Sequence, residues 1–187
     1  MDDETDKIEE KDIKDSKLIE IDVVLEVSGA ICKILINNIS GNGFFMKLEK
    51  LNKPFYCLIT CEHVIKEENV DSKSVIEVYY ENQKSKLKFP LNKNERFIRS
   101  YRYSNIDATV VEILPKDNVN EKFFLLPNLD YINGYEQFEG QKIYIPQFPG
   151  QRNLSFSSGK IKSVNIYTNE FSHLSTTDKG SSGSPIF

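Results

Sequence analysis

The sequence predicts an all-β protein built as an antiparallel barrel or sandwich. Short runs of aliphatic and aromatic residues recur at roughly 8–12-residue spacing, which is typical of such folds. Prolines and glycines fall between these runs, where they interrupt no ladder of hydrogen bonds. Only one short helical piece is expected, a turn or two directly after His63.

The expected strands begin with Ile19 to Ile36, which is rich in Val, Ile and Leu. A dense turn cluster follows at Asn37 to Gly43. Residues Phe44 to Leu48 then alternate between the two faces, as in a half-buried strand. The remaining expected strands are Phe55 to Ile59, Val75 to Tyr80, Leu87 to Phe89, Ile106 to Leu114, Lys142 to Ile145 and Ile161 to Tyr167.

Composition and charge divide the chain into three parts. Residues 1–17 contain eight acidic residues and four lysines, which account for the whole net charge of −4 and predict a disordered acidic tail. Residues 18–115 hold the first group of strands. Residues 116–187 hold the second group, and they begin with a connector, Lys116 to Tyr135, that has no strong period. A chain of 187 residues can form one domain or two small lobes.

Several classes of function are excluded. No basic stripe suggests nucleic acid as a partner. No apolar run is long enough to span a bilayer and no signal peptide is recognisable, so we expect an intracellular, cytoplasmic protein without membrane contact. Three cysteines are too few for a disulfide framework. Cys57 and Cys61 lie close to His63, but only one further histidine exists, so we expect neither a metal nor a cofactor.

Ser182 lies in Gly180-Ser-Ser-Gly-Ser-Pro185, a sequence suited to a nucleophile. Glycines permit backbone angles closed to other residues, so the chain can turn sharply and present the hydroxyl. The same turn would aim the amides of Gly180 and Ser182 at one spot, where they could hold an oxyanion. A flexible linker is the alternative, but Pro185 and two large apolar residues after it indicate the start of a strand.

His63 and Asp107 are the expected base and its orienting acid. His63 closes an apolar strand at a turn, a position at the rim of a barrel, and His173 is its only competitor. Asp107 lies in an apolar run, where a buried carboxylate needs a partner such as an imidazole. Asp71, Asp117 and Asp130 occupy polar turns and are weaker candidates.

The order His63, Asp107, Ser182 distinguishes between the folds that use this constellation. An α/β-hydrolase needs its histidine after the serine, and the subtilisin order needs an acid before the histidine. The order of this chain is that of chymotrypsin.

The chain from about Ile36 to Phe187 resembles the trypsin-like (chymotrypsin-fold) serine proteases, in particular the compact glutamyl-endopeptidase and HtrA-like branches. The resemblance is carried by Gly41-Asn-Gly-Phe-Phe45, Thr60-Cys-Glu-His-Val-Ile65, Asn105-Ile-Asp-Ala108, Ile145-Pro-Gln-Phe-Pro-Gly150 and Leu174 to Phe187. It implies two six-stranded antiparallel barrels, the second incomplete, with residues 18–115 carrying His63 and Asp107 and residues 116–187 carrying Ser182.

The resemblance also implies roles. Ser182 would be the nucleophile, His63 the general base, Asp107 its orienter, and the amides of Gly180 and Ser182 the oxyanion donors. Thr176 and Thr177 would form a polar, uncharged wall of the substrate pocket. The expected activity is cleavage of peptide or protein substrates through an acyl-enzyme, and the alternative is a weakly active or inactive peptide-binding module lacking the last strands.

Overall fold

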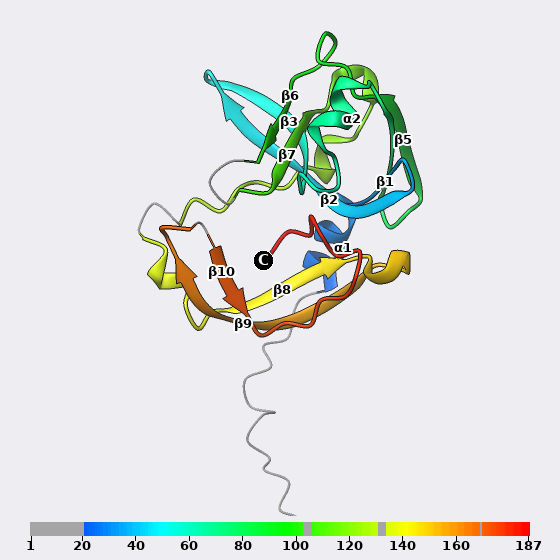
Figure 1. Cartoon of the computed structure of the whole chain (residues 1–187). Helices are drawn as coiled ribbons and strands as arrows, with labels where there is room; N and C mark the ends of the chain where they lie inside the picture. The colour runs from blue at the N-terminus through cyan, green and yellow to red at the C-terminus, as the bar shows by residue number, and fades with distance from the viewer. Residues whose placement is uncertain (1–20, 103–105, 131–133, 169) are drawn as a thin grey trace, which may run out of the picture.

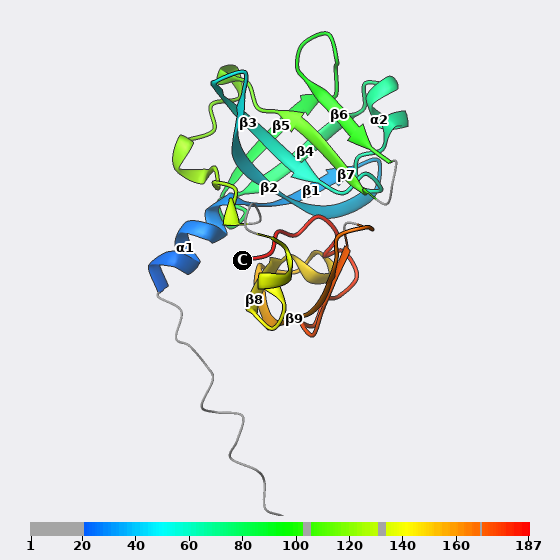
Figure 2. The same cartoon turned by 90° about the vertical axis from the view of Figure 1, so that its left-hand side faces the viewer.

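The computed structural model describes residues 21–102, 106–130, 134–168 and 170–187, and it contains two antiparallel sheets (Figures 1 and 2). The expected tail, residues 1–17, lies outside the described residues. The strands are β1 (Ile31–Ile36), β2 (Ile39–Lys50), β3 (Lys53–Thr60), β4 (Val75–Tyr80), β5 (Ser85–Pro90), β6 (Ile98–Tyr101), β7 (Ala108–Glu112), β8 (Lys142–Gln147), β9 (Ser155–Asn165) and β10 (Glu170–His173). The α-helices are α1 (Ile21–Ala30) and α2 (Glu67–Asp71), and short 3₁₀ turns occupy Pro115–Asp117, Glu121–Phe123, Glu136–Phe138 and Pro149–Gln151.

The first sheet has seven strands in the order β5-β4-β1-β2-β3-β7-β6, curled around one hydrophobic core. Tight two-residue turns join its central strands. Asn37 and Asn38, between β1 and β2, both have positive φ, at 44° and 66°, which matches the twist of a two-residue hairpin. The alternation of inward side chains brings Phe45 and Leu58 to full burial, and Phe45 packs edge-to-face on Tyr80 with ring centroids 5.2 Å apart.

The second sheet has three strands in the order β10-β9-β8. The C-terminal segment passes between the two sheets, as Figures 1 and 2 both show. Its last residue, Phe187, pairs with the outer edge of β8: its amide donates to the carbonyl of Tyr144 at 3.0 Å, and the amide of Tyr144 donates back at 2.8 Å. This reciprocal pair is the pattern of antiparallel strands.

The all-β fold predicted from the sequence is confirmed, and the segment after His63 does form a short helix, α2. The strand expected from Ile19 is wrong for its first part, because Ile21–Ala30 forms α1 and only Ile31–Ile36 is a strand. A continuous apolar run does not distinguish a helix from a buried strand. Gly29 allows the helix to dock, since a Cβ there would lie 2.7 Å from the ring of Phe123. The expected turn cluster is also shorter than predicted, because β2 already begins at Ile39, and β6 was not predicted.

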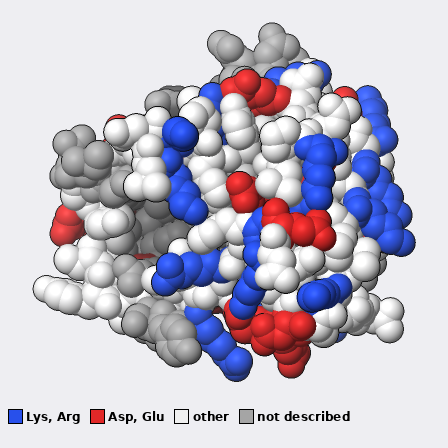
Figure 3. Space-filling view, turned by 90° about the horizontal axis from the view of Figure 1, so that it is seen from above, with Lys and Arg blue, Asp and Glu red and all other residues white. Residues whose placement is uncertain are grey.

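Charged side chains of both signs are interspersed on the face of the first sheet seen from above in Figure 3. Charged residues of the first sheet also pair locally: Glu77 on β4, for example, contacts both Lys86 and Lys88 of β5. None of the described helices is long and apolar enough to cross a membrane.

A buried ion pair joins the segment between β5 and β6 to the connector that leads toward the second sheet. The guanidinium of Arg96 donates to both carboxylate oxygens of Asp117, at 2.8 and 3.2 Å, and to the carbonyl of Glu112 at 2.9 Å. The side chains are 1% and 7% exposed, so neither charge can turn to water when its partner is removed.

We expect Asp117→Ala to lower the free energy of unfolding by about 3–5 kcal/mol, because Arg96 would keep a buried and uncompensated charge. Urea denaturation measures the change. Glu95→Ala is the control, since Glu95 pairs with Lys116 at an exposed site and should matter little. Equal stability of the two variants would contradict this role for the buried pair.

Candidate active site

His63 is held at the site by a closed turn after β3. The amides of Val64 and Ile65 both donate to the carbonyl of Cys61, at 3.1 and 3.2 Å. Val64 and Ile65 are buried in the core, whereas the side chain of His63 is 53% exposed. The two buried residues directly after His63 therefore anchor the turn in the core, and this fixes where the exposed imidazole can lie.

Asp107, the residue before β7, binds His63 twice. Its Oδ2 lies 2.5 Å from Nδ1 of the ring, and its Oδ1 accepts from the backbone N–H of His63 at 3.0 Å. Burial opposes ionisation of this carboxyl, but the hydrogen bonds from the ring and backbone of His63 outweigh it and lower the pKa of Asp107 below its ordinary value. The expectation of a buried carboxylate is wrong, because the side chain of Asp107 is 49% exposed at the end of its strand.

Cys61 lies beside this pair. The sulfur of Cys61, a ring nitrogen of His63 and a carboxylate oxygen of Asp107 lie within 4.8 Å of one another. Burial, followed by the negative charge of Asp107, raises the pKa of the Cys61 thiol to about 11, while the backbone N–H of Gly183 acts in the opposite direction. The serine loop lies beside this turn, because the backbone of Gly183 is in close contact with Thr60, the residue before Cys61.

The loop that carries Ser182 is docked on β2 by Asn42. The backbone N–H of Asn42 donates to the carbonyl of Ser182 at 2.7 Å, and its side-chain amide donates to the hydroxyl of Ser184 at 2.7 Å. The carbonyl of Asn42 in turn accepts the hydroxyl of Thr60 at 2.6 Å. Asn42 is fully buried, so these bonds form away from water.

Gly183 is required by this close contact. Its φ is +88°, and a Cβ at this position would lie 2.0 Å from the carbonyl oxygen of Asn42 and 2.7 Å from Oγ1 of Thr60. Both the backbone conformation and the lack of space exclude other residues. From the sequence, Gly183 is recognisable only as a turn residue and Asn42 only as part of a turn cluster, so their docking contact was not predicted.

The backbone amides proposed as oxyanion donors have no partner in the described part of the chain. The loop closes through other groups: the amide of Ser181 donates to the carbonyl of Asp178, and the amide of Ser184 donates to the carbonyl of Ser181, both at 3.1 Å. Gly180, with φ of +90°, adopts the left-handed conformation that lets the loop reverse. The amides of Gly180 and Ser182 are thus left available to a ligand.

The histidine and aspartate are brought together by the structure, and the serine lies in the adjoining loop. Among the described residues, no hydrogen bond joins the hydroxyl of Ser182 to the ring of His63. A cavity of about 280 Å³ adjoins the serine loop and is lined by Thr177, His173 and Ser182, among others. Thr176 does not line it: its carbonyl instead accepts from the side-chain amide of Gln147 at 3.1 Å.

The weaker acid candidates lie elsewhere. Asp117 pairs with Arg96 inside the first sheet, and Asp71 contacts Lys93 at its surface. Asp130 accepts only through its backbone, from the side chain of Gln137. Among the described residues, none of the three bonds to His63, whereas Asp107 does.

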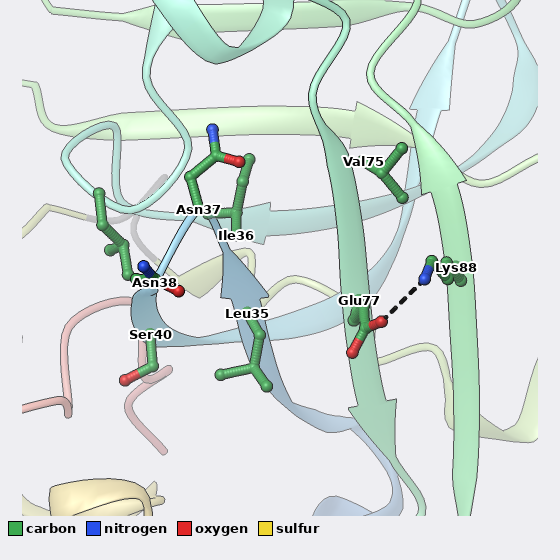
Figure 4. A pocket seen from close by; sticks show the side chains of 9 residues that line it. Leu35, Ile36, Asn37, Asn38, Ser40, Val75, Glu77 and Lys88 are labelled. Carbon is green, nitrogen blue, oxygen red and sulfur yellow. Dashed lines mark ion pairs between the residues drawn. The ribbon is translucent and has the colours of Figure 1, made fainter.

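Two other cavities lie away from this cluster. One, of about 470 Å³, lies beside the hairpin turn of Asn37 and Asn38, where Glu77 and Lys88 pair at its wall (Figure 4). The other, of about 580 Å³, lies between the sheets and is mostly apolar, with Phe44, Ile143 and Phe187 among its lining residues. Neither contains His63 or Asp107.

The curled first sheet, the smaller second sheet and the loop between them define a chymotrypsin-like β protein. The family model described as "Trypsin-like peptidase domain" matches residues 41–187, and the chain belongs to this family. The comparison with curated proteins finds no match.

Solved structures of serine proteases share the fold. Deg5 is 16% identical with a TM-score of 0.62, covering 89% of this chain and 78% of that chain. The serine endoprotease from Yersinia pestis is 15% identical with a TM-score of 0.63, covering 91% and 54%. The inactive form of the Rv3671c protease is 16% identical with a TM-score of 0.58, covering 88% and 74%. At these identities the similarity concerns the fold.

We expect Gly183→Ala to undock the serine loop, because its Cβ would collide with the backbone of Asn42 in a left-handed conformation. Strain of this kind costs about 1–3 kcal/mol. Hydrogen exchange measures the effect as faster exchange of the Asn42 amide, which binds Ser182. Gly140→Ala is the matched control: φ of Gly140 is also positive, at +76°, but no atom lies within 4 Å of its Cβ position. Equal protection of Asn42 in the two variants would show that the close contact is unimportant.

Proposed function

We propose that this chain is a serine endopeptidase that cleaves peptide bonds in peptide or protein substrates. The observation that carries the proposal is the double hydrogen bond between His63 and Asp107 beside a loop that presents Ser182 and two unpartnered amides. Membership of the trypsin-like peptidase family supports the same reaction class.

Each residue has a role in this mechanism. The Oδ2 of Asp107 accepts the Nδ1 proton of His63, which leaves Nε2 free to act as a base. Nε2 takes the proton of the Ser182 hydroxyl as the oxygen attacks the substrate carbonyl, and it later gives that proton to the leaving amine. The amides of Gly180 and Ser182 hold the negative oxygen of the tetrahedral intermediate. Water then hydrolyses the acyl-enzyme by the same route.

The substrate contacts are a separate proposal. Thr177 lines the cavity beside Ser182 and contributes a polar, uncharged part of its wall, next to Asp178, whose carboxylate pairs with Arg152. Thr176 would act through its position next to Thr177 and not through contact with the cavity. Neither threonine carries a charge, so neither could form an ion pair with a basic side chain of the substrate.

A peptide-binding module without turnover is the second candidate. Two observations favour it: Ser182 and His63 share no hydrogen bond within the described residues, and β8 accepts an extended segment at Phe187 beside an apolar cavity. A peptide would add as a further strand in this mode. Peptide binding that is unchanged by Ser182→Ala, without turnover, would favour this candidate over the enzyme.

We expect a fluorophosphonate probe to label Ser182 and Ser182→Ala to abolish labelling, because the probe reacts with an activated serine hydroxyl. Mass spectrometry of the labelled peptide identifies the residue. Ser163→Ala, which removes an exposed hydroxyl on β9, should label like the unmodified protein. A folded sample that no member of a broad probe set labels would overturn the enzymatic proposal.

We expect Asp107→Asn to slow labelling by about 10²–10⁴-fold, because an amide group can donate to Nδ1 and hold the wrong tautomer of His63. The rate constant of probe labelling measures this. Asp71→Asn is the control, since the exposed Asp71 pairs with Lys93 and does not bond to His63. Similar rates for the two variants would remove Asp107 from the mechanism.

A further inference from the structure

Three side chains of different chemistry converge at the site. A thiol (Cys61), an imidazole nitrogen (His63) and a carboxylate oxygen (Asp107) lie within 4.8 Å of one another. In a tetrahedral zinc site with bonds of about 2.0–2.3 Å, neighbouring ligand atoms are separated by about 3.5 Å. Small side-chain movements would therefore bring all three atoms into contact with one metal ion.

The backbone already holds two of these residues in place. Cys61 and His63 belong to the same closed turn, which the buried residues Val64 and Ile65 anchor in the core. Asp107 is held against this turn by the backbone N–H of His63 as well as by the ring. The protein would therefore lose little conformational entropy on binding a metal ion, because the ligands are already positioned.

The donor set selects the metal. Thiolate, imidazole and carboxylate together suit Zn²⁺, whereas Mg²⁺ and Ca²⁺ take oxygen ligands. Three protein ligands leave a fourth position for water. The half-exposed side chains of His63 and Asp107 provide access from solvent.

We propose that Cys61, His63 and Asp107 bind one zinc ion, and that this ion switches off the site at which Ser182 is activated. The inhibitory part rests on the proposed function, whereas the binding of zinc does not. Cys61 releases its thiol proton to solvent and coordinates the metal as thiolate.

Zinc and the catalytic arrangement exclude each other at either nitrogen of the ring. At Nδ1, the ion replaces the proton that bonds to Oδ2 of Asp107, 2.5 Å away. The ring proton must then lie on Nε2. At Nε2, the ion occupies the lone pair that would accept the proton of Ser182. In both cases His63 can no longer act as a base.

The spacing of Cys57, Cys61 and His63 along the sequence predicts no metal site. Cys57 is fully buried in the core of the first sheet, with its sulfur against the carbonyl of Met46, so it cannot reach the site. Asp107 is the missing donor, 44 residues from His63 along the chain and adjacent to it in space. Spacing along the sequence therefore could not indicate this site.

Isothermal titration of the full chain with zinc chloride tests the binding. We expect one equivalent to bind, and Cys61→Ser to bind at least about tenfold more weakly because it replaces the thiolate ligand. Ser182→Ala and His173→Asn should bind like the unmodified protein, since one removes only the nucleophile and the other removes the second histidine. Equal affinity of Cys61→Ser and the unmodified protein would overturn the proposal.

Cobalt provides a readout that does not depend on a variant folding correctly. Co²⁺ bound by the unmodified protein should give a thiolate-to-metal charge-transfer absorption in the near ultraviolet, together with the intense visible bands of tetrahedral coordination. Absence of the charge-transfer absorption at saturating cobalt would show that Cys61 is not a ligand and would overturn the site.

Probe labelling of Ser182 tests the inhibition. Zinc should slow labelling of the unmodified protein, and a chelator should restore the rate. The factor by which zinc slows labelling should be at least about tenfold smaller for Cys61→Ser than for the unmodified protein. If zinc inhibits both proteins equally, the switch is overturned. If the protein is never labelled even with chelator, the proposed function fails, and titration and cobalt absorption still decide the zinc site.

Discussion

The hydrogen bond from the backbone N–H of Asn42 to the carbonyl of Ser182, at 2.7 Å, is the contact on which the arrangement of the site depends. It joins a central strand of the first sheet to the loop that leads into the second. Because Asn42 is fully buried and its own carbonyl is held by Thr60, the bond is shielded from water and fixed on one side. Gly183 makes the approach possible, since any side chain there would occupy the space of the Asn42 carbonyl.

Two carboxylates illustrate how environment separates a structural role from a proposed chemical one. Asp117 is buried with a bidentate arginine and a backbone N–H, so its interactions are complete and serve to fix the connector. Asp107 is half exposed and bonds mainly to His63, a group that can itself exchange a proton. The more buried acid is therefore the structural one, which is the reverse of what the apolar neighbours of Asp107 suggested.

Alternation and turn residues were sufficient to predict the strands around Phe45, Leu58 and Val78, because each of these segments has one face on the core. They were insufficient for Ile21–Ala30, which is rich in Val, Ile and Leu as a strand would be, yet forms a helix whose Gly29 lies against Phe123. His63 and Asp107 were predictable as a pair from residue type and order. Their contact with Cys61, and the docking role of Asn42, depend on segments that only the folded chain brings together.

The histidine–aspartate pair and the serine belong to different structural units. The pair is fixed to the first sheet through the turn at Cys61, whereas the segment after Ser184 leads to the edge of β8 through Phe187. The distance between the imidazole and the hydroxyl is therefore set by how the loop is docked at Asn42 and by where the second sheet lies. A ligand that orders the loop would act first on the serine, while the proposed metal at Cys61, His63 and Asp107 would act first on the base. The site could thus be modulated from two sides, which follows from its construction at the junction of two sheets.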